Sequence, residues 1–237
     1  MNGWLYDGGG MGLYQEVYDK FGLVPLVCGN TGVQMTGWFR KEIKSADDFK
    51  GLKMRIPGLA GRVYQKLGVD VRLLPGGEIF PALERGVIDA AEFVGPYLDR
   101  QLGLQKVAKY YYTTGWHETA TVSEVAINKV AWDKLPPDLK AVVENACAAC
   151  NVISEAWCQK NNAEAFEDLV KNQGVIAQPL PDSVVAALRK GTEEVIAEAV
   201  AKDPLVKKVN DSYFAYLAKY KSWTALSEGV YHSKVLA

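Results

Sequence analysis

The chain has 237 residues, of which 49% are hydrophobic and 23% are charged, and its formal net charge is −1. This composition is typical of a globular protein of one large or two small domains, and the balanced charge argues against nucleic acid or an anionic membrane as a partner. No run reaches the ~18 apolar residues that predict a membrane span.

The front of the chain predicts a helix, a strand and a second extended run. Its first residues lack the basic stretch and apolar core of a secretory signal, and Met1 is followed directly by sequence typical of the middle of a domain, so we expect a missing front segment. A Gly-Gly-Gly turn at 8–10 precedes a helical pattern, and a short strand (23–30) and an extended run (32–43) follow. Ser45 is the expected N-cap of a short helix.

Residues 52–94 alternate between strand and helix patterns. The strand at 52–56 has apolar residues on one face and Lys53 and Arg55 on the other. Ligands of parallel sheets bind beyond the carboxyl ends of the strands, where Arg55 and Glu92 both stand. The alternation predicts a βαβαβ unit with a mostly parallel sheet. Its remaining elements are helices at about 59–67 and 76–86 and strands at 69–74 and 88–94.

Arg55 and Glu92 each have two interpretations. A guanidinium grips a carboxylate at two points, but Arg55 taken alone is more typical of an ordinary ion pair. Glu92 interrupts an apolar strand, and either a salt bridge or a ligand would supply the partner that it needs. With Gln34, Glu118 and a main-chain carbonyl, Glu92 could enclose a hard cation such as Na⁺ or Ca²⁺. The residues alone therefore indicate an α/β protein with a candidate anion site.

The second half is predicted to be mainly helical. An extended segment at 119–132 precedes one helix from Pro136 to about Asn172, which would be roughly 55 Å long and could connect two lobes. Asp182 caps a further helix, and the last residues form aromatic-rich helices. The long helix has one apolar stripe, made of Leu139, Val142, Val143, Ala146, Cys150, Ile153 and Trp157.

Few side chains suggest catalysis. No nucleophile, phosphate-loop, dinucleotide or H-E-x-x-H motif occurs, and the only histidines are His117 and His232. Cys147 and Cys150 form a C-x-x-C within the long helix, without the partners that a zinc site needs. The four cysteines are therefore expected to occupy small buried apolar positions.

Three stretches carry a resemblance that covers almost the whole chain: TGWFRKEIKSADDFKGLKMRIPG, LPGGEIFPALERGVIDAAEFVGP and GWHE. They resemble the solute-binding proteins of TRAP (tripartite ATP-independent periplasmic) transporters, in particular the subgroup that binds α-keto acids with a metal ion. The resemblance implies an α/β, two-lobed, periplasmic binding protein-like fold of type II, with a long hinge-spanning helix and an incomplete first lobe. It assigns 1–33 and 119–160 to lobe I, 34–118 and 161–205 to lobe II, and 206–237 to C-terminal helices that exchange between the subunits of a homodimer.

The resemblance also implies roles for the site residues. Arg55 would grip the carboxylate of the ligand, and Gln34, Phe93 and Glu118 would complete the substrate site. One cation, Na⁺ or Ca²⁺, would be held by Gln34, Glu92, the main-chain carbonyl of Phe93, and Glu118; family members commonly carry Trp at the Phe93 position. Two glutamates, one arginine and one ligand carboxylate carry a net charge of −2. Ca²⁺ would bring this charge to zero and Na⁺ would bring it to −1, and the charge count alone leaves both ions open.

The function implied is that of a periplasmic binding protein that delivers a 2-oxo monocarboxylate, such as pyruvate or 2-oxobutyrate, to TRAP membrane subunits. Family members are longer at the front and carry a signal peptide there, so this chain is expected to lack part of the pocket wall. Two alternatives stay open. One is a metal-assisted enzyme that uses Glu92 or Glu118 as the base on a keto acid. The other is a binding protein for lactate or a C4-dicarboxylate. A C4-dicarboxylate would need a second cationic side chain near Arg55, namely Lys53, Arg40 or Arg62.

Overall fold

The computed structural model describes residues 1–113 and 115–236. The chain divides into two compact units. Unit 1 comprises Met1–Pro25, Ala126–Pro136 and Ala197–Ala237, and unit 2 comprises Leu26–Val125 and Pro137–Ile196. The lobe boundaries expected from the resemblance lie at other positions and stay a prediction.

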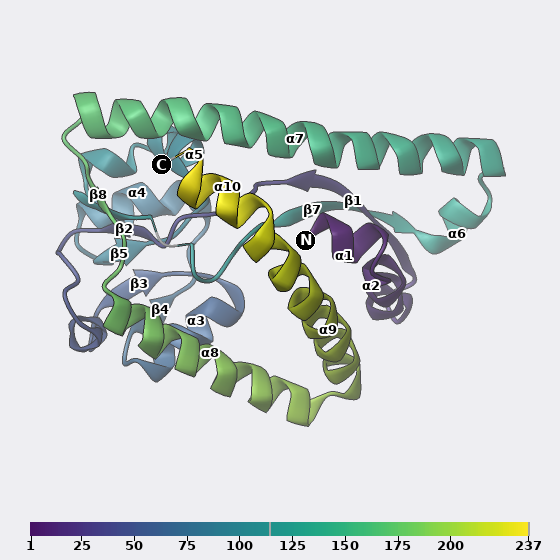
Figure 1. Cartoon of the computed structure of the whole chain (residues 1–237), viewed down its shortest axis with the longest axis horizontal. Coiled ribbons are helices and arrows are strands. Elements are labelled where there is room, and N and C mark those ends of the chain that lie inside the picture. Colours follow the sequence, from purple (N-terminus) through teal and green to yellow (C-terminus); the bar gives the residue numbers. More distant parts are fainter. Residues whose placement is uncertain (114, 237) are drawn as a thin grey trace. The chain divides into compact units, whose positions relative to one another are not determined.

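Unit 2 is built around a six-stranded mixed sheet with the strand order β4-β3-β5-β2-β6-β8 (Figure 1). Strand β3 pairs in parallel with β4 and β5, which confirms the predicted βαβαβ unit, whereas β2 runs antiparallel to both of its neighbours. The strands are β2 (Gly37–Phe39), β3 (Lys53–Arg55), β4 (Asp70–Arg72), β5 (Ala90–Ala91), β6 (Tyr110–Tyr112) and β8 (Ile176–Gln178).

Helices cover both faces of this sheet. Alternate side chains of a strand point to opposite faces, so Phe39 and Tyr112 join one apolar core while their neighbours Trp38 and Tyr111 join the other. The first core is covered by α3 (Gly58–Lys66) and α8 (Asp182–Lys202). The second is covered by α4 (Gly76–Glu84), η2 (Leu104–Lys106) and α7 (Pro137–Asn172). Helix α5 (Pro96–Gln101) packs against α7, and α4, α5 and α7 are labelled in Figure 1.

The long helix α7 has 36 residues, as expected, but the face that it buries is not the predicted one. Its buried side chains are Cys147, Asn151, Cys158, Ala165 and Leu169. The predicted apolar stripe lies largely in solvent, with Val142 63% and Ile153 66% exposed. The difference arises because a helix buries the side that meets its neighbours, here α5 and the end of β1, whatever its own apolar pattern.

The cysteines correct a second expectation. Cys147 and Cys158 are buried, whereas Cys28 is half-buried and Cys150 is exposed. Cys150 lies on the predicted apolar stripe of α7 that faces solvent, so it shares the reason for that error.

Unit 1 gathers the two ends of the chain. The Trp4 indole donates a hydrogen bond to Ser212 Oγ (3.1 Å) and packs edge-on against Tyr213 at 5.3 Å between ring centroids. Asp203 caps the main C-terminal helix by accepting from Leu205 N (2.8 Å). The helices are α1 (Asn2–Tyr6), α2 (Gly10–Asp19), α6 (Lys129–Asp133), α9 (Pro204–Leu226) and α10 (Glu228–Lys234).

Two strands, β1 (Leu23–Asn30) and β7 (Val122–Asn128), form a separate two-stranded sheet that passes from one unit to the other. The extended run predicted at 119–132 is shorter than expected, because the Asn128 side chain accepts from Ala131 N (3.1 Å) and so begins α6. Ser45 caps η1 (Ala46–Phe49) as predicted. Among the described residues, no helix is both long and apolar enough to cross a membrane.

Candidate functional site

Arg55 stands at the carboxyl end of β3 with its guanidinium turned into unit 2. Only 11% of the side chain is exposed. Nε donates to the Leu74 carbonyl (3.2 Å), and Nη1 donates to the main-chain carbonyl of Glu92 (2.5 Å). Within residues 1–113 and 115–236, Nη2 has no hydrogen-bond partner. Arg55 is therefore rigidly held with one edge of its fork unused.

Glu92 follows β5 and is the ionic partner of Arg55. Its side chain is 2% exposed, and its Oε2 lies 3.3 Å from Arg55 Nη1. Burial raises the pKa of the Glu92 carboxyl, and the neighbouring His117 and Arg55 side chains act in the opposite direction. Burial also lowers the pKa of the Arg55 guanidinium, which Glu92, Asp99 and Glu118 partly offset. An arginine stays charged under either influence, so Arg55 keeps a positive charge in a place where little water screens it.

Gln34 and Glu118 lie together although 84 positions separate them in the sequence. Gln34 N donates to the Glu118 carbonyl (3.1 Å), and the Gln34 amide nitrogen donates to Thr121 Oγ1 (2.8 Å). Thr121 Oγ1 in turn donates to Glu118 Oε2. These bonds leave the buried Gln34 Oε1 without a partner in the described part of the chain. An unpaired buried carbonyl oxygen is an unused acceptor that a cation or a donor could satisfy.

Two further contacts connect these pairs. Met35 N donates to the Val94 carbonyl (3.2 Å), which joins the segment of Gln34 to the segment of Glu92 and Phe93. The Phe93 ring lies 5.8 Å from the guanidinium carbon of Arg55, and the Phe93 carbonyl accepts no hydrogen bond from described residues. All five residues named from the resemblance thus belong to one connected region.

The oxygens available suit a hard cation only if amide and main-chain carbonyls take part. Within the described residues, no three His, Cys, Asp or Glu side chains are arranged to hold a metal ion by themselves. The unpaired Gln34 Oε1 and Phe93 carbonyl are neutral oxygens of the kind that Na⁺ and Ca²⁺ accept beside carboxylates. The residues present therefore fit such an ion.

Sequence reasoning missed His117. Its side chain is 2% exposed, and its Nε2 lies 3.8 Å from Glu92 Oε1. Its only sequence signal was its place beside Glu118 in GWHE, which is too short a pattern to predict a role.

Sequence reasoning missed Asp99 as well, a buried residue whose hydrogen bonds fix the main chain next to the site. Its Oδ1 accepts from Val94 N (3.1 Å), and its Oδ2 accepts from Trp38 Nε1 and Tyr111 OH (both 2.9 Å). Asp99 therefore holds the main chain just after Phe93. Asp99 lies in the first turn of α5, where acidic residues are common because they complement the helix dipole. Its position in the sequence therefore did not indicate a role in the site.

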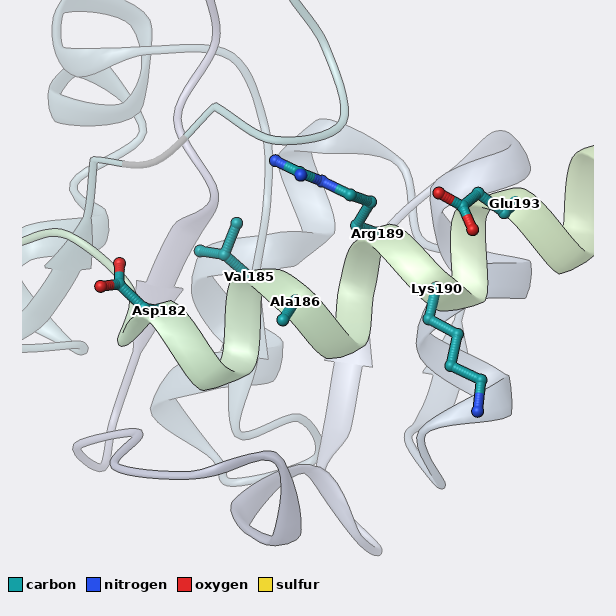
Figure 2. A pocket seen from close by; sticks show the side chains of 6 residues that line it. All are labelled: Asp182, Val185, Ala186, Arg189, Lys190 and Glu193. Atoms are coloured by element: carbon teal, nitrogen blue, oxygen red, sulfur yellow. The ribbon is translucent and has the colours of Figure 1, made fainter.

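Another depression on unit 2, shown in Figure 2, does not gather such groups. It is lined only by residues of α8, and Arg189 and Lys190 extend from the helix in different directions. Side chains of a single helix that diverge do not converge on a ligand, so this depression is not a candidate site.

Comparison with known proteins assigns the chain to a family. Residues 2–203 match the bacterial extracellular solute-binding proteins of family 7. The chain belongs to this family. The assignment confirms the resemblance and the fold class inferred from the sequence, and the family is one of extracellular binding proteins rather than enzymes.

Among relatives of this family 7 chain, the monocarboxylate 2-oxoacid-binding periplasmic protein of Nostoc sp. is 41% identical over 230 residues, which are 97% of this chain and 63% of the relative. The TRAP solute-binding protein of Pseudoalteromonas atlantica, solved with sodium and pyruvate, is 40% identical with a TM-score of 0.94, and the match covers 98% of this chain and 71% of that one. A TRAP solute-binding protein of Bordetella bronchiseptica, a dimer solved with calcium and picolinate, is 39% identical with a TM-score of 0.95; coverage is 99% and 70%. The chain thus spans somewhat under two thirds of the curated relative.

Proposed function

We propose that this chain is a TRAP solute-binding protein that captures a 2-oxo monocarboxylate such as pyruvate or 2-oxobutyrate in the periplasm. The observation that carries the proposal is the buried Arg55 guanidinium. Hydrogen bonds to the Leu74 and Glu92 carbonyls fix it, and its Nη2 has no hydrogen-bond partner among the described residues. A close relative is described as a monocarboxylate 2-oxoacid-binding periplasmic protein, and a similar structure was solved with pyruvate.

Arg55 is proposed to bind the carboxylate of the ligand. Its Nη2 can donate to a carboxylate oxygen while Nε and Nη1 keep their bonds to the protein. Because the guanidinium is already oriented and largely dehydrated, little side-chain freedom is lost on binding. Neighbouring Phe93 is proposed to form part of the pocket wall.

A cation is proposed to sit beside the ligand, held by Gln34 Oε1, the Glu92 and Glu118 carboxylates, and the Phe93 carbonyl. When bound, the ion would offset the repulsion between these glutamates and the anionic ligand. Relatives were solved with sodium or with calcium, and their ligands, pyruvate and picolinate, share a carboxylate with a heteroatom on the adjacent carbon. That shared feature is our reason for proposing a 2-oxo acid.

The dicarboxylate alternative lacks support from the geometry. The charged groups that act on Arg55 are all acidic, namely Glu92, Asp99 and Glu118. Lys53 and Arg40, two of the side chains that could have bound a second ligand carboxylate, are both exposed. The acidic groups beside Arg55 therefore favour a ligand with one carboxylate over a ligand with two.

The proposed partners are the TRAP membrane subunits and a second copy of the chain. The Bordetella relative is a dimer. In this chain α9 and α10 bury no side chain, and Phe214, Trp223 and Tyr231 are each at least 46% exposed. Large exposed apolar side chains of this kind mark a surface that another chain covers.

Thermal unfolding with pyruvate tests the ligand assignment. At a concentration about 100-fold above its Kd, pyruvate should stabilise the chain by ~2.7 kcal/mol, which corresponds to a Tm increase of roughly 5–10 °C. Arg55→Ala should abolish the increase, and Arg55→Lys should reduce it strongly, because lysine keeps the charge but loses the planar fork. Removal of Na⁺ and Ca²⁺ with a chelator in sodium-free buffer should also reduce it.

Arg72→Ala is the matched control. Arg72 stands opposite Arg55 in the register of β3 and β4, but its side chain is 53% exposed. The Arg72 variant should respond to pyruvate like the unsubstituted chain. An unsubstituted chain whose Tm is unchanged by every 2-oxo acid, with or without the cations, would rule out the assignment.

A further inference from the structure

His117 is a buried histidine whose ring nitrogens have no hydrogen-bond partner among the described residues. A neutral imidazole carries one donor and one acceptor, and a buried pair of such atoms is normally satisfied by protein or by ordered water. The position of His117 in the candidate site suggests that its partner is something that enters the site.

A cavity next to His117 offers mainly apolar surroundings. His117 lines a cavity of about 150 Å³ whose other walls are mainly apolar side chains of α3 and α8, among them Leu59, Val63 and Val195. The one hydroxyl there, on Thr192, already donates to the Leu188 carbonyl (2.8 Å). This cavity therefore does not supply the missing partner.

The His117 ring also lies near Glu92. The distance from His117 Nε2 to Glu92 Oε1 is 3.8 Å, which is longer than a hydrogen bond. The second oxygen of the same carboxyl group lies 3.3 Å from Arg55 Nη1. His117 and Arg55 therefore flank one carboxyl group, and both present unused hydrogen-bonding capacity beside it.

We propose that a ring nitrogen of His117 donates a hydrogen bond to an oxygen of the bound 2-oxo acid, so that the ligand is held by Arg55 and His117 on the two sides of Glu92. The inference rests on the proposed function and adds a ligand-contacting residue to it. An anionic ligand with three oxygens provides an acceptor for each residue. Gln34, Glu118 and the cation need not change for this contact to form.

Calorimetric titration with pyruvate at a fixed Ca²⁺ concentration tests the contact. His117→Phe keeps a planar aromatic ring and removes both nitrogens, and it should weaken pyruvate binding about 10- to 100-fold, the effect of losing one hydrogen bond to a charged group. His117→Gln places an amide near the position of Nε2 and should restore most of the affinity. His232→Phe, at the other histidine of the chain, which is exposed on α10, should bind pyruvate like the unsubstituted chain.

A spectroscopic readout separates direct contact from support of the fold. The chain has two histidines, so the ring signals in a nitrogen–proton NMR spectrum can be assigned with the His232 variant. Pyruvate should move the ring signals of His117 and leave those of His232 in place.

The outcomes are distinguishable. If the unsubstituted chain fails to bind pyruvate, the proposed function fails and this inference falls with it. If pyruvate binds but His117→Phe binds it equally well, or the ring signals of His117 stay fixed at saturation, only this inference is overturned.

Discussion

Arg55 and Glu92 hold opposite charges in a place that water scarcely reaches, with 11% and 2% of their side chains exposed. A buried ion pair of this kind contributes little net stability, because the loss of hydration nearly cancels the attraction between the charges. Removal of either partner, by contrast, leaves a buried charge alone. The pair is therefore consistent with the role proposed for Arg55 in binding a charged ligand, whereas it contributes little to stability.

Asp99 is the second residue whose burial has a measurable consequence. Burial raises its pKa to about 7, and the hydrogen bonds from Trp38, Tyr111 and Val94 lower it only in part. Between about pH 4 and pH 7 the folded chain therefore binds the Asp99 proton more tightly than the unfolded chain does. The free energy of unfolding must fall as pH rises through this window.

The pH dependence of stability tests this assignment. A pKa displaced from 3.8 to about 7 corresponds to on the order of 4 kcal/mol of stability lost between pH 4 and pH 7. Asp99→Asn cannot ionise, so chemical unfolding of this variant across that range should lack the Asp99 contribution. Glu92, whose pKa is also raised by burial, should still contribute a smaller fall in the same direction.

Asp47→Asn serves as the control for Asp99. Asp47 is exposed in η1 and pairs with Lys50 at the surface, where an ion pair contributes little to stability, so this variant controls for the loss of a carboxyl group. Equal slopes for Asp99→Asn and the unsubstituted chain would show that Asp99 is not the buried acid described here.

At the level of secondary structure, strand β2 approaches β5 closely at Ala91, the residue just before Glu92. Gly37 begins β2 with φ of 126°, and a Cβ atom added there would lie 2.5 Å from the Ala91 carbonyl oxygen. Trp38 pairs with Ala91 in the same register. Only glycine fits this position, because any side chain would push β2 away from the residue just before Glu92.

Gly37→Ala should therefore lower the free energy of unfolding by about 1–3 kcal/mol, through backbone strain and the clash with Ala91. It should also weaken pyruvate binding, since Glu92 is displaced with β5. Gly77→Ala in α4 is the matched control, because nothing lies within 4 Å of a Cβ atom added there. The control should change stability by no more than about 1 kcal/mol in urea unfolding. A Gly37 variant as stable as the control would contradict the close approach.

At the scale of the whole molecule, the exposed apolar side chains of α9 and α10 require an explanation. In solution the chain should have about twice its monomer mass of 26.0 kDa by light scattering. Trp223, which is 67% exposed, should contribute to the contact between copies. Trp223→Asp should shift the protein toward the monomer, since a charge placed in an apolar interface loses its hydration without a partner.

Lys219→Asp, on the same helix, controls for the added negative charge and should leave the dimer intact. The proposal would be withdrawn if the unsubstituted chain were monomeric at every concentration tested, or if both variants dissociated alike.

Local patterns determined much of this protein from its sequence. The βαβαβ alternation, the length of α7, the Ser45 cap and the place of Arg55 at a strand end all follow from periodicities and capping residues that lie within about forty positions of one another. The stretches that carry the family resemblance are likewise contiguous, so the family was accessible without a structure.

Only the tertiary structure decided what depends on neighbours distant in the chain. The apolar stripe of α7 did not predict which face is buried, because burial is set by the elements that pack against it. The sequence likewise gave no reason to connect His117 with Glu92 or Asp99 with Val94. Hydrogen bonding and desolvation act between atoms a few ångströms apart in space, and the folded chain alone brings those atoms together.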